Sequence, residues 1–127
     1  YKGRDSTRQV HLEPARNAYT GPLVVLIDVM SLSSAEEFSG AMQAIDRAVI
    51  VGERSAGICV VANWTQLPNG ATFMYPIEQT QTAGGTVLEG QGVIPNFEVK
   101  LDRALLLQGV DSQLEAAVEY IERQASE

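Results

Sequence analysis

The sequence has little of what several common protein classes need. It has one cysteine (Cys59), one histidine (His11) and two lysines, and nine basic residues stand against 16 acidic ones. A single cysteine excludes an internal disulfide, and with one histidine it cannot complete a Cys/His zinc site. The formal charge of −7 argues against binding to nucleic acid or to anionic lipid, both of which need clustered basic groups. The longest apolar run, residues 23–27, is far too short to span a membrane.

What remains is a chain of ordinary apolar content and domain size. Its 127 residues are 45% hydrophobic, which excludes a disordered chain and suits one domain over residues 1–127. Residues 1–20 are polar and poorly patterned. The chain begins at Tyr1 without a methionine, and we therefore expect a fragment of a longer protein.

The central part of the chain has a strand–helix–strand pattern. Two short apolar runs, residues 23–27 and 48–52, predict buried strands, and turn signals bound each of them. Between them, apolar residues recur at helical spacing from Ala35 to Ile45, which predicts an amphipathic helix with Ser33 or Ser34 near its N-cap. This order favours a parallel strand pair with a right-handed crossover, and thus an α/β fold.

Further elements are predicted downstream. Residues 59–66 and 71–77 form a predicted hairpin around the turn sequence Pro-Asn-Gly at 68–70. Residues 78–92 are rich in Gly, Thr and Gln and predict a surface loop, and residues 93–99 predict a short extended segment. Asp111 is placed to cap a final helix.

The most informative chemistry lies where the first strand turns into the helix. Three serines, Ser31, Ser33 and Ser34, stand at this junction. Unpaired N–H groups at a helix start can stabilise an oxyanion, so a serine placed there could attack a carbonyl. The plainer interpretation is that Ser33 caps the helix and forms a capping box with Glu36, and spacing alone favours it.

Five segments in order resemble the C-terminal processing (tail-specific) serine peptidases. They are SLSSAEEFSGAM at 31–42 with its preceding strand GPLVVLI at 21–27, RAVIVGERSAG at 47–57, the turn at 67–70, LEGQGVIP at 88–95, and DSQLEAA at 111–117. The resemblance implies a ClpP/crotonase-like ββα core, of which this chain would be the C-terminal part. It also implies a peptide-hydrolysing enzyme that needs no cofactor and no metal, acts on protein or peptide substrates, and works outside the cytoplasm of a bacterium, in the periplasm or secreted.

The resemblance also implies roles for particular residues. Ser33 would be the nucleophile, the backbone N–H of Ser34 would be one oxyanion donor, and Glu36 would be a supporting carboxylate. The branch of the family with a Ser–Lys dyad would place its lysine at position 58, where this sequence has Ile58. The sequence is therefore more similar to the tricorn and interphotoreceptor retinoid-binding branch, whose peptidases use a histidine base oriented by a glutamate. Glu89 is the candidate for that glutamate.

Alternatives to a peptidase stay open. The missing lysine also fits a non-catalytic binding module of the same fold, for an apolar ligand or a peptide. A crotonase-type acyl-CoA enzyme would share the architecture, but the motifs match the peptidases. In a partial domain an exposed sheet edge would favour homo-oligomers. His11, in the polar N-terminal segment, is not assigned as the base.

Overall fold

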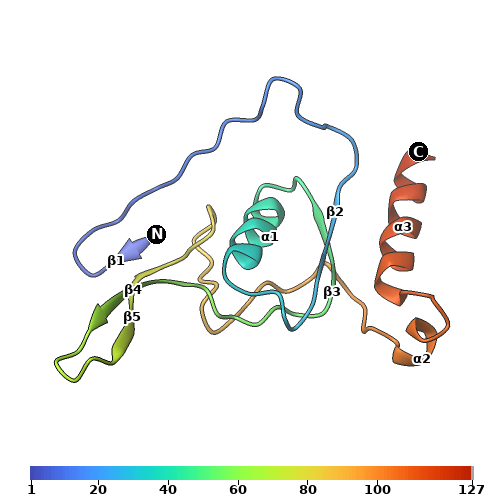
Figure 1. Ribbon diagram of the computed structural model, residues 1–127. Coiled ribbons are helices and arrows are strands. Elements are labelled where there is room, and N and C mark those ends of the chain that lie inside the picture. Colours follow the sequence, from blue (N-terminus) through green and yellow to red (C-terminus); the bar gives the residue numbers. More distant parts are fainter. Residues whose placement is uncertain (127) are drawn as a thin grey trace.

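The computed structural model describes residues 1–126, so residue 127 of the predicted domain lies outside the described part. The chain forms two small sheets and two longer helices (Figure 1). The elements in chain order are β1 Lys2–Gly3, β2 Val24–Ile27, α1 Ser34–Ala44, β3 Val49–Gly52, β4 Val60–Gln66, β5 Thr72–Gln79, β6 Phe97–Glu98, α2 Arg103–Leu106 and α3 Ser112–Ala125.

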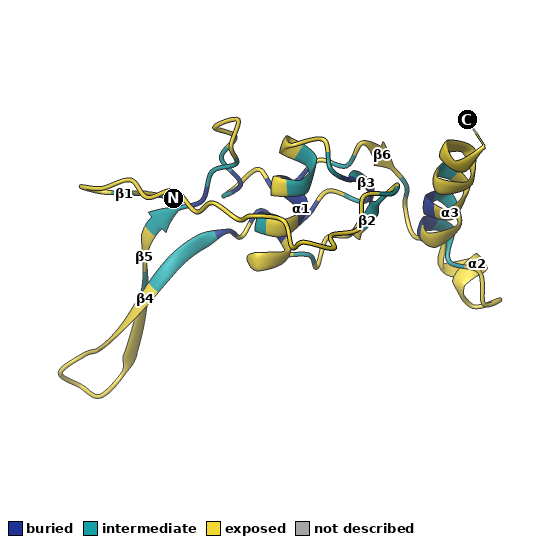
Figure 2. Cartoon of the chain, turned by 90° about the horizontal axis from the view of Figure 1, so that it is seen from above, coloured by how far each residue is buried: buried dark blue, intermediate teal, exposed yellow. Residues whose placement is uncertain are grey.

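The first sheet carries the predicted strand–helix–strand unit. Strands β2 and β3 pair in parallel over their whole length, with Val24 opposite Val49, and β6 adds to the far edge of β3. Helices α1 and α3 lie on opposite sides of this sheet (Figures 1 and 2). The predicted α/β class and the parallel crossover are therefore confirmed.

The second sheet is a hairpin that projects from the body (Figure 1). Strands β4 and β5 pair antiparallel around the predicted turn at residues 68–70, with a bulge between Val61 and Ala62. Strand β1 pairs with the end of β5, so the first residues of the chain meet residues 78 and 79. Most hairpin residues are exposed, because no further layer of the described chain covers either face (Figure 2).

A small apolar core lies where the first sheet meets α1 and the loop before β6. Its buried members are Ile27, Ala48, Ile50, Cys59, Leu88 and Val93. Leu88 and Val93 belong to the segments predicted as a surface loop and an extended piece, so these segments contribute to the core. Asp111 caps α3 as predicted, because its carboxylate accepts hydrogen bonds from the N–H groups of Gln113 and Leu114.

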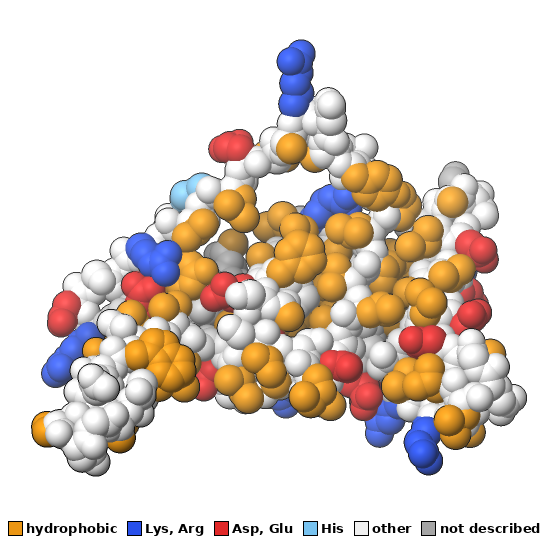
Figure 3. All heavy atoms as spheres, in the orientation of Figure 1, with side chains coloured by type: hydrophobic (Ala, Val, Ile, Leu, Met, Phe, Trp, Pro, Cys, Tyr) orange, Lys and Arg blue, Asp and Glu red, His pale blue; other side chains and the backbone are white. Residues whose placement is uncertain are grey.

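Helix α1 differs from its predicted orientation. The apolar stripe was expected to face the core, yet Phe38 is 50% and Ile45 is 61% exposed. The buried residues of this helix are instead Glu36, Ser39 and Gly40. Strand β2 was likewise predicted as buried, but only Ile27 in it is. The three short strands form a sheet too small to bury the apolar sides of α1 and β2. Hydrophobic side chains around these two elements therefore stay exposed (Figure 3).

Candidate active site

Ser33 lies where the turn after β2 enters α1. Asp28 holds this turn, because its carboxylate accepts hydrogen bonds from the Met30 N–H at 2.8 Å and the Ser31 hydroxyl at 3.2 Å. Ser33 is the N-cap residue of α1, and it is exposed. The serine therefore stands at the start of the helix, as the change of period in the sequence predicted, and it is exposed.

The backbone of Ser33 is unusual for a helix cap. Its φ is 56° and its ψ is −121°, whereas N-cap residues ordinarily have extended backbones. Only Ser33 and Asp46 combine a side chain with a positive φ in the described residues. Such a conformation costs about 1–3 kcal/mol and persists only where surrounding contacts hold it. A strained serine at a strand-to-helix turn is also the geometry of a nucleophile elbow.

Glu36 supplies those contacts. Its side chain is fully buried, with 0% exposed. One oxygen, Oε1, accepts from the Ser55 hydroxyl at 2.6 Å and the Gly57 N–H at 2.7 Å. The other, Oε2, accepts from the Ile58 N–H at 3.0 Å and the Ser33 N–H at 3.1 Å. Four donors replace the water that a buried carboxylate loses, so its burial is compensated without a cation.

The Ser33–Glu36 capping box expected from spacing is present. It coexists with the positive φ of Ser33, so capping and exposure of the hydroxyl do not exclude one another. The next residue, Ser34, opens the helix, and its N–H donates no hydrogen bond within residues 1–126. An unpaired N–H at the positive end of a helix dipole is suited to stabilise an oxyanion.

Position 58 adjoins the serine directly. The Ser33 N–H donates to the Ile58 carbonyl at 2.9 Å, while the Ile58 side chain is 57% exposed. The residue that hydrogen-bonds Ser33 through its backbone therefore has a hydrocarbon side chain. This side chain can neither accept nor donate a proton.

Glu89 returns to the same region from the loop before β6. Its carboxylate accepts a hydrogen bond from the Cys59 N–H at 2.6 Å, and Cys59 Sγ lies 3.6 Å from the carbonyl oxygen of Ser33. The Gly90 N–H also donates to the Gly57 carbonyl at 2.8 Å. Gly90 has a φ of 72°, which supports the expectation that glycine allows this return. Glu89 is thus connected to Ser33 through the Cys59 residue that lies between them.

Cys59 itself is an unreactive neighbour. It is 2% exposed, and burial raises the pKa of its thiol to about 11. A thiol with so high a pKa stays protonated at neutral pH and is a poor nucleophile. In the described part of the chain no three His, Cys, Asp or Glu side chains are grouped to hold a metal ion. His11 is exposed in the N-terminal segment.

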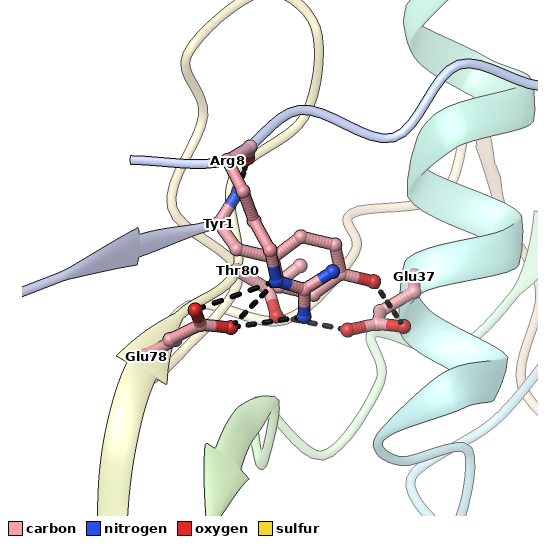
Figure 4. Close-up of polar contacts among 5 residues, drawn as sticks. All are labelled: Tyr1, Arg8, Glu37, Glu78 and Thr80. Atoms are coloured by element: carbon pink, nitrogen blue, oxygen red, sulfur yellow. Dashed lines mark hydrogen bonds and ion pairs between the residues drawn. The ribbon is translucent and has the colours of Figure 1, made fainter. Parts of the chain in front are cut away.

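A second polar cluster, absent from the sequence-based expectations, adjoins the first turn of α1 (Figure 4). Glu37 accepts hydrogen bonds from the Thr80 hydroxyl at 2.9 Å and the Tyr1 hydroxyl at 3.2 Å. Arg8 pairs with Glu78 at 2.9 Å and covers the Tyr1 ring. The partners lie far apart in the chain, in residues 1–8, at Glu37 and in residues 78–80, so no local spacing signals them.

The fold and the site together define a class. A parallel α/β unit carries an exposed serine with a positive φ at a helix start and an unpaired N–H beside it. The family model "Peptidase family S41" matches residues 1–99, and the chain belongs to this family.

Curated relatives agree. The carboxyl-terminal-processing protease of Picosynechococcus sp. is 28% identical over 79% of this chain and 25% of its own length. The chloroplastic C-terminal processing peptidase of Tetradesmus obliquus is 33% identical over 70% of this chain and 19% of its own length. The chain therefore spans about a quarter, or less, of the relatives it matches.

Solved structures confirm the fold. Mature CPAF is 26% identical, with a TM-score of 0.66 over 85% of this chain and 20% of that one. The tricorn protease has a TM-score of 0.75 over 95% of this chain and 12% of that one, at 22% identity, which shows a common fold. The predicted family and its ClpP/crotonase-like core are thus confirmed, and the branch within the family stays a prediction. No described helix is both long and apolar enough to cross a membrane.

Proposed function

We propose that residues 1–127 are the C-terminal part of the catalytic domain of a serine peptidase that hydrolyses peptide bonds in protein or peptide substrates. The observation that carries this proposal is the exposed Ser33 with its positive φ of 56° at the helix start. In the proposed reaction the Ser33 hydroxyl attacks the scissile carbonyl. The Ser34 N–H donates to the oxyanion that forms, while a histidine base from another part of the complete protein takes the hydroxyl proton. The C–N bond then breaks as the base gives this proton to the leaving amine, and water hydrolyses the remaining Ser33 ester by the same base.

Two carboxylates support this reaction in different ways. Glu36 acts as a positioning group, because it holds the Ser33 N–H and the strained turn rather than touching a substrate. Glu89 would orient a histidine base that another part of the complete protein supplies, as in a Ser–His–Glu arrangement. Its carboxylate faces the Cys59 N–H, beside the Ser33 backbone, which is a suitable place for this role. A protein with this base belongs to the branch related to tricorn.

A second candidate function is a non-catalytic binding module for an apolar ligand or a peptide. The observation that favours it is Ile58, whose backbone hydrogen-bonds Ser33 and which stands at the position where a Ser–Lys enzyme would carry its base. The two candidates differ in whether Ser33 reacts. With either function, we propose that the protein works outside the cytoplasm, in the periplasm or secreted, in keeping with the processing proteases that it resembles. The free edge of β2 offers a site for a homo-oligomer.

The decisive experiment compares the complete protein with its Ser33→Ala variant. The wild type is expected to cleave an unfolded substrate such as casein and to react with a fluorophosphonate, and the variant to do neither. Glu89→Gln should lower kcat by orders of magnitude with little change in KM, since an oriented base matters in the transition state. Residues 1–127 alone should be inactive, because they have Ile58 in place of a lysine base and lack the histidine that the complete protein would supply.

Ser34→Ala is the matched control, because it keeps the backbone N–H and removes only a neighbouring hydroxyl. Binding of peptides by the wild type without any Ser33-dependent hydrolysis or labelling would contradict the peptidase and support the binding module.

A further inference from the structure

The Ser55 hydroxyl is buried between the serine turn and the segment that carries Glu89. Ser55 is 6% exposed. Its Oγ donates to Glu36 Oε1 at 2.6 Å and accepts from the Val93 N–H at 2.6 Å. The Ser55 hydroxyl lies between a carboxylate, which accepts, and an N–H, which donates. A hydroxyl suits this position because it can donate and accept at the same time.

This hydroxyl completes a continuous path of hydrogen bonds. The path begins at the Ser33 N–H, passes through the two oxygens of the Glu36 carboxylate and the Ser55 hydroxyl, and ends at the Val93 N–H. Val93 closes the loop that starts at Glu89. The path therefore links the backbone of the candidate nucleophile to the loop of the candidate base-orienting residue.

The backbone of Ser55 packs closely against the backbone of residues 92 and 93. The Ser55 N–H donates to the Val93 carbonyl at 3.1 Å. A Cβ on Gly92 would lie 2.7 Å from the Ser55 carbonyl oxygen, so glycine is needed for the approach. On the exposed side, Arg54 donates to the carbonyls of Gln91 and Gly90. The loop is thus held from outside by Arg54 and from inside by Ser55.

We propose that Ser55 is a positioning residue whose hydroxyl fixes residues 89–93, and with them Glu89, relative to Ser33. The proposal deepens the proposed peptidase function and rests on it for its catalytic consequence. Ser55 touches no reacting atom, so its effect on the reaction is exerted through Glu36 and Glu89. Losing the hydroxyl would leave the Glu36 carboxylate and the Val93 N–H each one partner short in a buried place.

The test uses the complete protein with Ser55→Ala, Ser55→Thr and Ser39→Ala. Ser39 is the matched control, because it is also a buried serine, at 0% exposed, but its hydroxyl donates only to carbonyls of its own helix. Ser55→Ala should lower kcat by about 10- to 100-fold, as expected for a misplaced catalytic group, with little change in KM. Ser55→Thr retains the hydroxyl and should restore most of kcat, and Ser39→Ala should leave kcat unchanged.

Amide hydrogen exchange supplies a readout that needs no activity. Exchange of residues 89–93 should be faster in Ser55→Ala than in the wild type, and unchanged in Ser39→Ala. If Ser55→Ala does not fold, Ser55→Cys replaces it, because the thiol keeps a weak donor and acceptor in place of the hydroxyl and weakens both hydrogen bonds.

The outcomes separate this proposal from the proposed function. Ser33-dependent hydrolysis with an unaltered kcat in Ser55→Ala would overturn the role of Ser55 and leave the peptidase standing. An equal loss in Ser39→Ala would also overturn it, because any buried serine would then matter. A complete protein without Ser33-dependent hydrolysis would refute the peptidase and the catalytic consequence, and unchanged exchange in residues 89–93 would refute the positioning as well.

Discussion

The serine turn and the β4–β5 hairpin are organised in opposite ways. Around the turn, a fully buried carboxylate, Glu36, receives four hydrogen bonds, and segments far apart in the chain meet closely. In the hairpin, large apolar side chains such as Trp64, at 63%, and Phe73, at 50%, are exposed. Around the serine turn, burial of Glu36 therefore follows its hydrogen bonds rather than hydrophobicity, and the two regions should respond differently to substitution.

The largest expected effect is at Glu36. In Glu36→Gln an amide NH₂ replaces one carboxylate oxygen, so two donors that now bind this oxygen would face another donor. The substitution should therefore lower the free energy of unfolding by about 3 kcal/mol or more. The measurement is urea denaturation of the complete protein. Glu37→Gln is the control on the same helix, since its carboxylate is half-exposed and accepts only from Tyr1 and Thr80. Equal losses in the two variants would contradict the special role of the buried carboxylate.

An intermediate effect is expected for glycines of the loop after Glu89. Gly92 and Gly90 have similar φ values of 68° and 72°. A Cβ on Gly92 would meet Ser55 atoms at 2.7 and 2.8 Å, whereas one on Gly90 would meet nothing within 4 Å. Gly90→Ala should cost about 1 kcal/mol for the left-handed backbone alone. Gly92→Ala should cost clearly more in the same denaturation experiment, and equal costs would show that the close contact is absent.

The smallest effect is expected in the hairpin. Trp64 pairs across the strands with Met74, but neither face is covered by the described chain. Trp64→Ala should therefore change the free energy of unfolding by less than about 1 kcal/mol. Thermal or urea denaturation measures this change. A loss as large as that of Glu36→Gln would mean that the hairpin is packed more tightly than its exposure indicates.

Local signals in the sequence predicted the frame of the fold. Short apolar runs bounded by turn signals marked β2 and β3, and the Pro-Asn-Gly turn marked the hairpin. The change of period at Ser33 marked the helix start correctly. These features depend on neighbours within a few residues, which is why they can be recognised without the structure.

The rest depends on partners distant in the chain. The apolar spacing of α1 predicted an amphipathic helix, yet Phe38 is half-exposed and Glu36 is buried, because residues 55–58 supply the donors that Glu36 needs. Strand β1 exists only because it meets β5, and the four-residue α2 is too short to show a period. At the site, Ser33 and Glu36 followed from local spacing and resemblance, whereas Ser55 required the coordinates.

Because Ser33 has a positive φ, the proposed function and the stability of the domain favour different residues at this position. Glycine would relieve the strain at this position and make the domain more stable, yet it would remove the hydroxyl. A screen of variants for heat resistance alone would therefore select glycine at position 33 and a protein without the candidate nucleophile. In the proposed peptidase, natural selection must hold serine there against a continuous thermodynamic advantage of its simplest replacement.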